Sequence, residues 1–286
     1  QMHRTDSGAV PTPQDTQAQF LDAVYRLYAP HKDEVTGIAM ALPGFVDNRT
    51  GYVSNGGALL YNTATPVGQL LAEKCGCPVF LENDGKAAAM AELANGALKD
   101  CCNAAVFIIG TGVGGGIIAN GQLVRGVHFT AGEYSFVNTN AEAWDAPDQN
   151  MACQCSTSNL LKWYRARKAL PENAPLNGRS FFAAANAGEP EALEVLRRFC
   201  HAVAVQIYNL TVLLDVEKVA IGGGISKQPL LLESLRSAYD GLYASRAGQA
   251  YMEGLPRCQI VPCAFSSEAN QVGVAAAYFE AMQKKR

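Results

Sequence analysis

The stretch Ala104–Gly126, AAVFIIGTGVGGGIIANGQLVRG, decides the fold that the sequence predicts. Ala105–Ile109 is an apolar, partly β-branched run and predicts a buried strand. Gly110–Gly116 follows at once, and Ile117–Ala119 is a second apolar run. Asn120-Gly121 is then a strong signal for a two-residue hairpin turn. We therefore expect the glycines to lie between two strands.

Glycines between strands differ from those of the common nucleotide-binding loops. A dinucleotide-binding loop opens a helix, and a P-loop ends in Gly-Lys-Ser/Thr; this stretch does neither. A strand–turn–strand unit with little side-chain bulk can direct backbone N–H groups at an anion, and Thr111 adds a hydroxyl donor. Such a turn suits nucleotide phosphates. The alternative is a tight hairpin that needs glycine only for positive φ.

The composition is that of a globular protein. The chain has 286 residues, 49% of them hydrophobic and 17% charged, which allows one large domain or two smaller ones. A net charge of −3 with no basic tract argues against nucleic acid and anionic membranes as partners. We expect no transmembrane segment and no signal peptide. Nine scattered cysteines are typical of reduced thiols and predict a cytoplasmic protein.

Strands alternate with helices along the chain, which predicts an α/β fold. One junction of interest follows the strand Glu217–Ile221, where Gly222-Gly223-Gly224-Ile225 precedes a helix over Leu230–Leu242. Backbone N–H groups at such a strand–turn–helix junction can meet the ribose or phosphate of a nucleotide.

A second junction follows the short strand Pro78–Leu81. Asn83 and Asp84 precede an alanine-rich run, Gly85–Leu98, that strongly favours a helix. Open α/β sheets present functional side chains at such junctions, and a helix N-terminus stabilises a carboxylate. The alternative for either residue alone is ordinary N-capping. We assign Glu82, at the end of the strand, a structural role.

Cys153 and Cys155 raise the question of a zinc site. A structural site needs four Cys or His ligands, usually with a spacer of two to four residues between cysteines. A one-residue spacer without a third cysteine nearby favours ordinary thiols. The four histidines, at positions 3, 31, 128 and 201, form no metal-ligand spacing.

Five short motifs, in order along nearly the whole chain, resemble the ROK sugar kinases and their relatives (repressor, open reading frame, kinase). They are Pro43-Gly44 with Asp47, Leu81–Asp84, Gly110–Gly116, Gly132-Glu133, and Asp215 with Ile221–Ile225. The resemblance implies the actin-like, ribonuclease-H-like ATPase fold, with two lobes around a cleft. The smaller lobe would hold residues 1–100 and 266–286, and the larger one residues 101–265.

The sequence departs from the family pattern in three places. The family begins with a strand and a DxGGT-type loop that holds phosphates and Mg²⁺, and the chain as given starts after it, so we expect these 286 residues alone to transfer phosphate poorly. Phe136 stands where the family has a histidine, and the zinc stretch is reduced to Cys153–Ser158. We therefore expect no structural zinc. Lys162 stands where the family has a sugar-binding glutamate, so the sugar itself is not predicted.

The resemblance implies an ATP-dependent kinase, with Mg²⁺, for a hexose or hexose derivative. Asp84 would be the catalytic base. The implied sugar-binding residues are Asn83, Glu133, Asn55 and Gly57. The implied ATP-binding residues are Thr111, Gly112, Val113, Gly114, Gly222, Gly223, Gly224 and Ile225. The alternative is a sugar-sensing transcriptional regulator or a non-catalytic sugar-binding protein of the same family. A homodimer is also implied.

Overall fold

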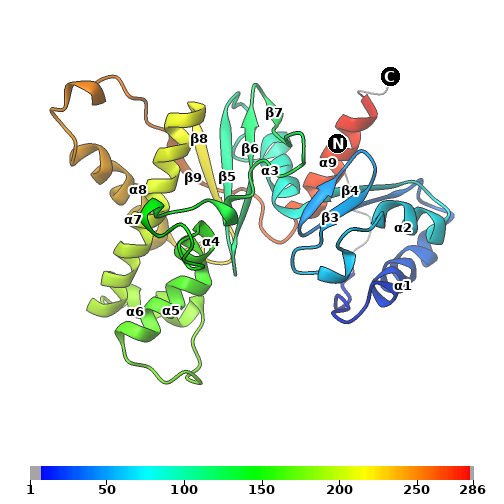
Figure 1. Ribbon diagram of the computed structural model, residues 1–286, viewed down its shortest axis with the longest axis horizontal. Helices are drawn as coiled ribbons and strands as arrows, with labels where there is room; N and C mark the ends of the chain where they lie inside the picture. The colour runs from blue at the N-terminus through cyan, green and yellow to red at the C-terminus, as the bar shows by residue number, and fades with distance from the viewer. Residues whose placement is uncertain (1–7, 284–286) are drawn as a thin grey trace. The chain divides into compact units, whose positions relative to one another are not determined.

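The computed structural model describes residues 8–283. The chain divides into two compact units (Figure 1). Unit 1 contains the described residues up to Asp84 together with 277–283, and unit 2 contains Gly85–Ala276. The predicted lobe boundary lies later, at residue 100. The division falls earlier because the helix that begins at Asp84 makes its contacts with unit 2, as shown below. The arrangement of two lobes around a cleft stays a prediction.

Unit 1 has two small sheets and two helices. Its elements are α1 (Gln17–Tyr28), η1 (Ala29–His31), β1 (Ile38–Leu42), β2 (Phe45–Asp47), β3 (Tyr52–Asn55), η2 (Leu60–Asn62), α2 (Val67–Cys75) and β4 (Val79–Asn83). β1 pairs in parallel with β4, and Leu42 lies opposite Asn83. β2 and β3 form an antiparallel pair. Because β1 and β4 are parallel, the residues that follow both strands meet at one edge of the sheet.

The sequence predicts Thr65 as the N-cap of α2 and Pro66 as its first residue; this prediction is wrong by one position. Pro66 is the N-cap, and no side chain caps the helix. The Thr65 hydroxyl instead donates to the Asn62 carbonyl at 2.6 Å and accepts from the Gln17 amide at 3.0 Å. One contact within the preceding turn and one to a distant residue therefore outweigh the capping preference of threonine.

Unit 2 consists of a five-stranded sheet with helices on both faces. Its strands are β5 (Ala104–Ile109), β6 (Val113–Ala119), β7 (Gln122–Leu123), β8 (Lys218–Gly222) and β9 (Gln259–Pro262). Its helices are α4 (Met151–Cys155), α5 (Thr157–Arg167), α6 (Gly178–Asn186), α7 (Pro190–Leu214) and α8 (Pro229–Ala244), with η3 (Tyr134–Phe136), η4 (Ala141–Ala143) and η5 (Ala250–Met252). α3 (Asp84–Asn95) begins at the last residue of unit 1, and α9 (Ala269–Gln283) contributes to both units.

The sheet of unit 2 has the strand order β7-β6-β5-β8-β9. β5, β8 and β9 are parallel, whereas β6 is antiparallel to β5 and to β7. The predicted turn between β6 and β7 is confirmed, because Asn120 and Gly121 have φ of 52° and 70°, as a type I′ hairpin turn requires.

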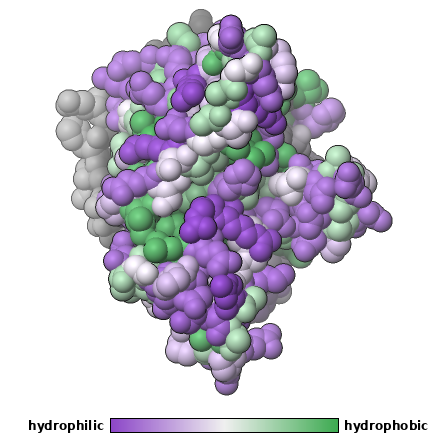
Figure 2. Space-filling model, turned by 90° about the vertical axis from the view of Figure 1, so that its left-hand side faces the viewer, coloured by the Kyte–Doolittle hydropathy of each residue, from purple (hydrophilic) through white to green (hydrophobic). Residues whose placement is uncertain are grey.

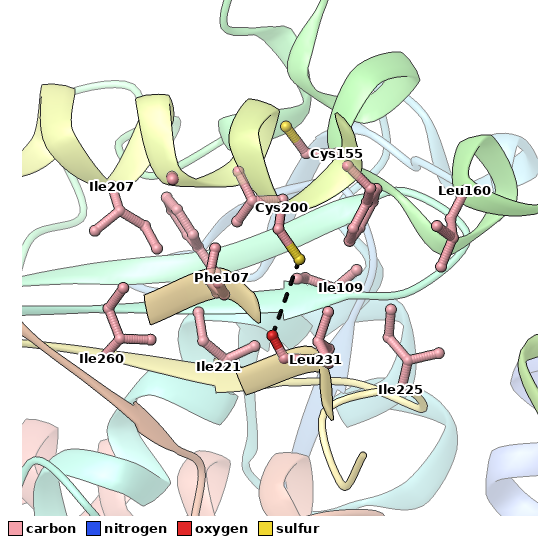
Figure 3. Close-up of a cluster of buried hydrophobic side chains, with 14 of the residues drawn as sticks. Phe107, Ile109, Cys155, Leu160, Cys200, Ile207, Ile221, Ile225, Leu231 and Ile260 are labelled. Carbon is pink, nitrogen blue, oxygen red and sulfur yellow. Dashed lines mark hydrogen bonds between the residues drawn. The ribbon is translucent and has the colours of Figure 1, made fainter. Parts of the chain in front are cut away.

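The main core lies between the sheet and the long helices α7 and α8. Alternate residues of β5, including Phe107 and Ile109, face this core together with Ile221 of β8 (Figure 3). Cys155 and Cys200 are buried among these apolar side chains, and the Cys200 thiol lies 3.9 Å from the Leu231 carbonyl. Burial raises the pKa of both thiols to about 12.

Helix α3 packs on the opposite face of the sheet from α7 and α8 (Figure 1). A side chain at Gly85 would lie 2.5 Å from the backbone nitrogen of Gly115 in β6, so the start of α3 touches the strand backbone directly. At the other end of α3, the buried Glu92 carboxylate accepts from the backbone N–H groups of Ala264 and Phe265. These contacts assign α3 to unit 2.

Figure 2 shows one face, where apolar side chains gather in hollows between larger polar areas. Within residues 8–283, no helix combines the length and the apolar character that crossing a membrane requires.

Candidate functional site

The two glycine turns of unit 2 lie side by side at one edge of the sheet. The register of the parallel pair β5–β8 places Ile108 opposite Gly222, so the turns that follow both strands are neighbours. Gly223 has a φ of 98°, and a side chain there would collide with the Ile109 carbonyl oxygen. Only glycine fits at this position, because both the conformation and the space exclude a Cβ.

Thr111 and Gly112 form the turn between β5 and β6, and Thr111 is exposed at its tip. Val113 and Gly114 belong to β6 rather than to the turn. The Ser135 hydroxyl donates to the Val113 carbonyl at 2.8 Å and lies 3.4 Å from the Val113 nitrogen. These contacts fix the base of the turn from outside the hairpin.

A pocket of about 410 Å³ in unit 2 opens beside these turns. Three helices begin at its wall: α5 at Thr157, α6 at Gly178 and α8 just after Gln228. The residues that line it are Gly110, Thr157, Asn177, Gly178, Arg179, Gly224, Ile225 and Gln228. Helix N-termini carry a partial positive charge, so three of them around one pocket favour an anionic ligand.

The sequence prediction included Gly224 and Ile225 of this pocket but missed Thr157, Asn177, Arg179 and Gln228. Asn177 and Ser180 form a capping box that starts α6. That pattern is visible in the sequence and locates a helix start, but nothing local shows that this start lies beside Gly110. The helix N-termini and the Arg179 side chain give this pocket a positive character that suits an anionic ligand.

In unit 1 the structure brings together three of the predicted sugar-binding residues. The Asn83 amide donates to the Gly44 carbonyl at 2.9 Å, and the Asn55 side-chain oxygen accepts from the Gly57 nitrogen at 2.8 Å. A side chain at Gly44, where φ is 90°, would lie 2.7 Å from the Gly57 nitrogen. Asn83 at the end of β4 and Asn55 and Gly57 at the end of β3 thus form one cluster around Gly44, which follows β1.

Glu82 and Asp84 flank Asn83 but differ in their surroundings. Glu82 is fully buried and accepts from the Asn48 amide at 3.2 Å and from the Asn83 nitrogen at 3.1 Å, which supports the structural role predicted for it. Asp84 is the acidic residue in the first turn of α3. A carboxylate there is stabilised by the helix N-terminus.

Glu133 lies in unit 2, where it forms an ion pair that the sequence analysis did not anticipate. The ammonium nitrogen of Lys86 lies 2.8 Å from Oε1 of Glu133. The Lys86 side chain is 1% exposed and that of Glu133 20% exposed. In the sequence, Lys86 stands inside the alanine run of α3. Lysine is common in helices, so nothing local indicates that it pairs with Glu133.

Cys153 and Cys155 lie in α4, and both are free thiols. Cys155 is buried, whereas the Cys153 sulfur lies 3.7 Å from the Pro147 carbonyl. Phe136 is 68% exposed. In the part of the chain that the structure describes, no three His, Cys, Asp or Glu side chains are grouped so that they could hold a metal ion.

We predict that the purified protein contains no stoichiometric zinc, because two thiols and a phenylalanine do not make a tetrahedral site. Elemental analysis after dialysis against metal-free buffer checks this. A zinc content near one ion per chain that survives dialysis would contradict it.

The sequence profile of the ROK family matches residues 2–283. The chain is 31% identical over 214 residues to the beta-glucoside kinase of Listeria innocua, and the alignment covers 75% of this chain and 73% of that protein. Its structure is similar to that of a ROK family protein from Streptococcus pneumoniae TIGR4 in complex with sucrose, with a TM-score of 0.84, 27% identity, and coverage of 98% of this chain and 91% of the other. It is also similar to a ROK family glucokinase from Streptomyces griseus in complex with glucose and AMPPNP, with a TM-score of 0.77, 25% identity, and coverage of 94% and 89%. These similarities confirm the predicted fold class.

Proposed function

The chain belongs to the ROK family, and on that premise we propose that it is an ATP-dependent kinase that phosphorylates a hydroxyl group of a hexose or hexose derivative. The relatives named above support this reading, since one is a beta-glucoside kinase and another is a glucokinase with glucose and a nucleotide analogue. Phosphoryl transfer asks little of a protein beyond positioning and charge stabilisation.

The observation that carries the proposal is the pocket in unit 2 between two glycine turns and three helix N-termini. ATP would lie there, with its phosphates toward the Thr111 turn. Thr111 would donate its hydroxyl, and the N-terminus of α5 would add positive potential. Gly224 and Ile225 would pack against the nucleoside part of ATP.

We propose that Mg²⁺ binds together with ATP, coordinated by the phosphates. Magnesium sites of this kind use one or two carboxylates and complete their coordination with phosphate and water. When bound, the ion supplies neutralisation of the phosphate charge. We assign no residue of the described chain to it.

At the sugar, we propose Asp84 as the general base. Its carboxylate would accept the proton of the attacking sugar hydroxyl. Asn83, Asn55 and Gly57 would present polar groups to the sugar, and Glu133 would accept hydrogen bonds from sugar hydroxyls. The close packing of the Gly44 turn explains how such short polar groups are held in place.

The test is an ATP-consumption assay on the full-length protein with Mg²⁺ and a panel of glucose, other hexoses, their N-acetylated derivatives and β-glucosides. Turnover with at least one sugar supports the kinase. Sugar binding by calorimetry without turnover would contradict the kinase and favour the alternative, a sugar-sensing regulator or non-catalytic binding protein.

We predict that Arg179→Ala raises the KM for ATP by about tenfold, because an arginine–phosphate contact is a strong, charge-assisted hydrogen bond. The KM for sugar should change less than about twofold. Arg167→Ala is the matched control: Arg167 is the last residue of α5, exposed, and pairs with Glu194. Equal ATP KM values for both variants would remove Arg179 from the nucleotide site.

We also propose that the protein acts in the cytoplasm and forms a homodimer. All nine cysteines are free thiols, as expected in the reducing cytoplasm. The homodimer that the resemblance implies can be checked by sedimentation of the purified protein.

A further inference from the structure

The buried ammonium of Lys86 has no role in the chemistry described so far. Lys86 is the third residue of α3, two positions after Asp84, and its Nζ lies 2.8 Å from Oε1 of Glu133. The two residues are 47 positions apart in the chain. This contact therefore joins the helix that begins with the proposed base to a residue of the proposed sugar site.

The two members of the pair differ in exposure, and that difference separates their roles. The Lys86 side chain is 1% exposed, so its ammonium is shut off from a bound ligand. The Glu133 side chain is 20% exposed and can reach one. Lys86 can thus act on a sugar only through Glu133.

The backbone that carries Glu133 is held independently of Lys86. The hydroxyl of the next residue, Tyr134, donates to the Gly116 carbonyl at 3.1 Å, and its ring packs edge-on against Phe107 with centroids 4.5 Å apart. Gly132, with φ of 79°, precedes Glu133, and a Cβ there would lie 3.3 Å from Gly116. With the backbone fixed, the remaining freedom of Glu133 is that of its side chain, which the ammonium restricts.

Stability alone is a poor explanation for this lysine. Replacing both members of a buried ion pair with apolar groups is often neutral or stabilising, because desolvation of the two charges offsets their attraction. A nearby cation, in contrast, favours the ionised form of a carboxylate and restricts its orientation, which serves a carboxylate that binds a ligand.

We propose that Lys86 is a positioning residue of the sugar site: its buried ammonium orients the Glu133 carboxylate and compensates its charge, so that Glu133 accepts hydrogen bonds from sugar hydroxyls. This rests on the proposed function, in which Glu133 binds the sugar. Lys86 itself touches neither the sugar nor ATP.

The experiment is a double-mutant cycle with Lys86→Met, Glu133→Gln and the double variant, read by sugar calorimetry and by steady-state kinetics. Methionine keeps an unbranched apolar stem and removes the charge. Lys86→Met should weaken sugar binding and raise the sugar KM by at least about tenfold, with kcat and the ATP KM within about threefold. The double variant should bind sugar no more weakly than Glu133→Gln, because the lysine has nothing left to orient.

A purely structural lysine would give a different pattern. Lys86→Met would then lower the melting temperature and leave sugar affinity unchanged, which overturns the proposal. If Lys86→Met does not fold, the double variant, in which both charges are gone, is compared with Glu133→Gln, and a further tenfold loss of sugar affinity would equally overturn it.

Calorimetry also separates this proposal from the kinase. Wild-type protein that binds sugar without phosphorylating it contradicts the kinase. The sugar affinities of the double-mutant cycle still test the role of Lys86 in that case. Wild-type protein that binds no sugar of the panel overturns both.

Discussion

Asp84→Asn is expected to lower kcat for sugar phosphorylation by at least about 100-fold while sugar affinity stays within about threefold. A sugar hydroxyl is a weak nucleophile, and a base within hydrogen-bond reach orients it and removes its proton as the bond to phosphorus forms. General-base assistance is typically worth about 10²–10⁴-fold. The amide keeps the shape of the carboxylate and can still cap a helix, but it cannot accept the proton.

The position of Asp84 supports this expectation. It follows β4 directly and begins α3, whose second residue, Gly85, lies against the backbone of β6. Its carboxylate is thus carried by two regular elements rather than by a loop. The N-terminus of α3 also favours the ionised form that a base needs.

Steady-state kinetics and sugar calorimetry on the full-length variant measure both quantities. Asp100→Asn, an exposed aspartate in the turn after α3, is the matched control and should behave as wild type. Glu133→Gln should show the opposite pattern, a raised sugar KM with kcat largely retained. Near-normal kcat for Asp84→Asn would remove this residue from the mechanism and favour a sugar-binding protein.

Glu92→Met is expected to destabilise unit 2 by at least about 3 kcal/mol. The Glu92 carboxylate is 1% exposed and accepts three backbone N–H groups, from Ala97 at 2.8 Å, Ala264 at 3.0 Å and Phe265 at 2.9 Å. A hydrogen bond to a charged group contributes about 1.5–3 kcal/mol, and Glu92→Met removes three of them. Methionine fills similar space and accepts none of these bonds.

Thermal and denaturant unfolding of the purified protein measure this effect, and we expect the melting temperature to fall by roughly 6 °C or more. Glu73→Met is the control, because Glu73 is exposed on α2 and bonds only at the surface with the Gln69 side chain at 2.8 Å. Similar melting temperatures for the two variants would show that the carboxylate of Glu92 contributes little.

Local backbone chemistry explains which parts of the fold could be predicted. The turn at Asn120-Gly121 needs two positive φ angles, and few residue pairs supply them, so the sequence alone locates it. The turn after β8 follows in part for the same reason, because Gly223 has a φ of 98°, whereas Gly110, Thr111 and Gly112 of the turn after β5 all have negative φ. Thr65 shows the limit: its capping preference is real, but Asn62 and Gln17 occupy its hydroxyl instead.

The candidate site could be predicted only where its residues sit in motifs. Asn83 and Gly57 were assigned by resemblance, and the structure places them together around Gly44. Their roles stay predictions. Arg179 and Lys86 were missed because each acts across a long stretch of chain, as the separation of 47 positions between Lys86 and Glu133 illustrates. Pairing over such distances depends on the tertiary fold and leaves no local pattern.

The two buried thiols in the core of unit 2, Cys155 and Cys200, allow local opening of this core to be measured by chemical labelling. Because the pKa of Cys155 and of Cys200 is about 12, both stay protonated at neutral pH, and both are sealed among apolar side chains. An alkylating reagent reaches them only when this core opens locally. The labelling rate of Cys155 and Cys200 therefore measures how often this core opens. The exposed Cys102 needs no opening, and its labelling rate serves as the reference.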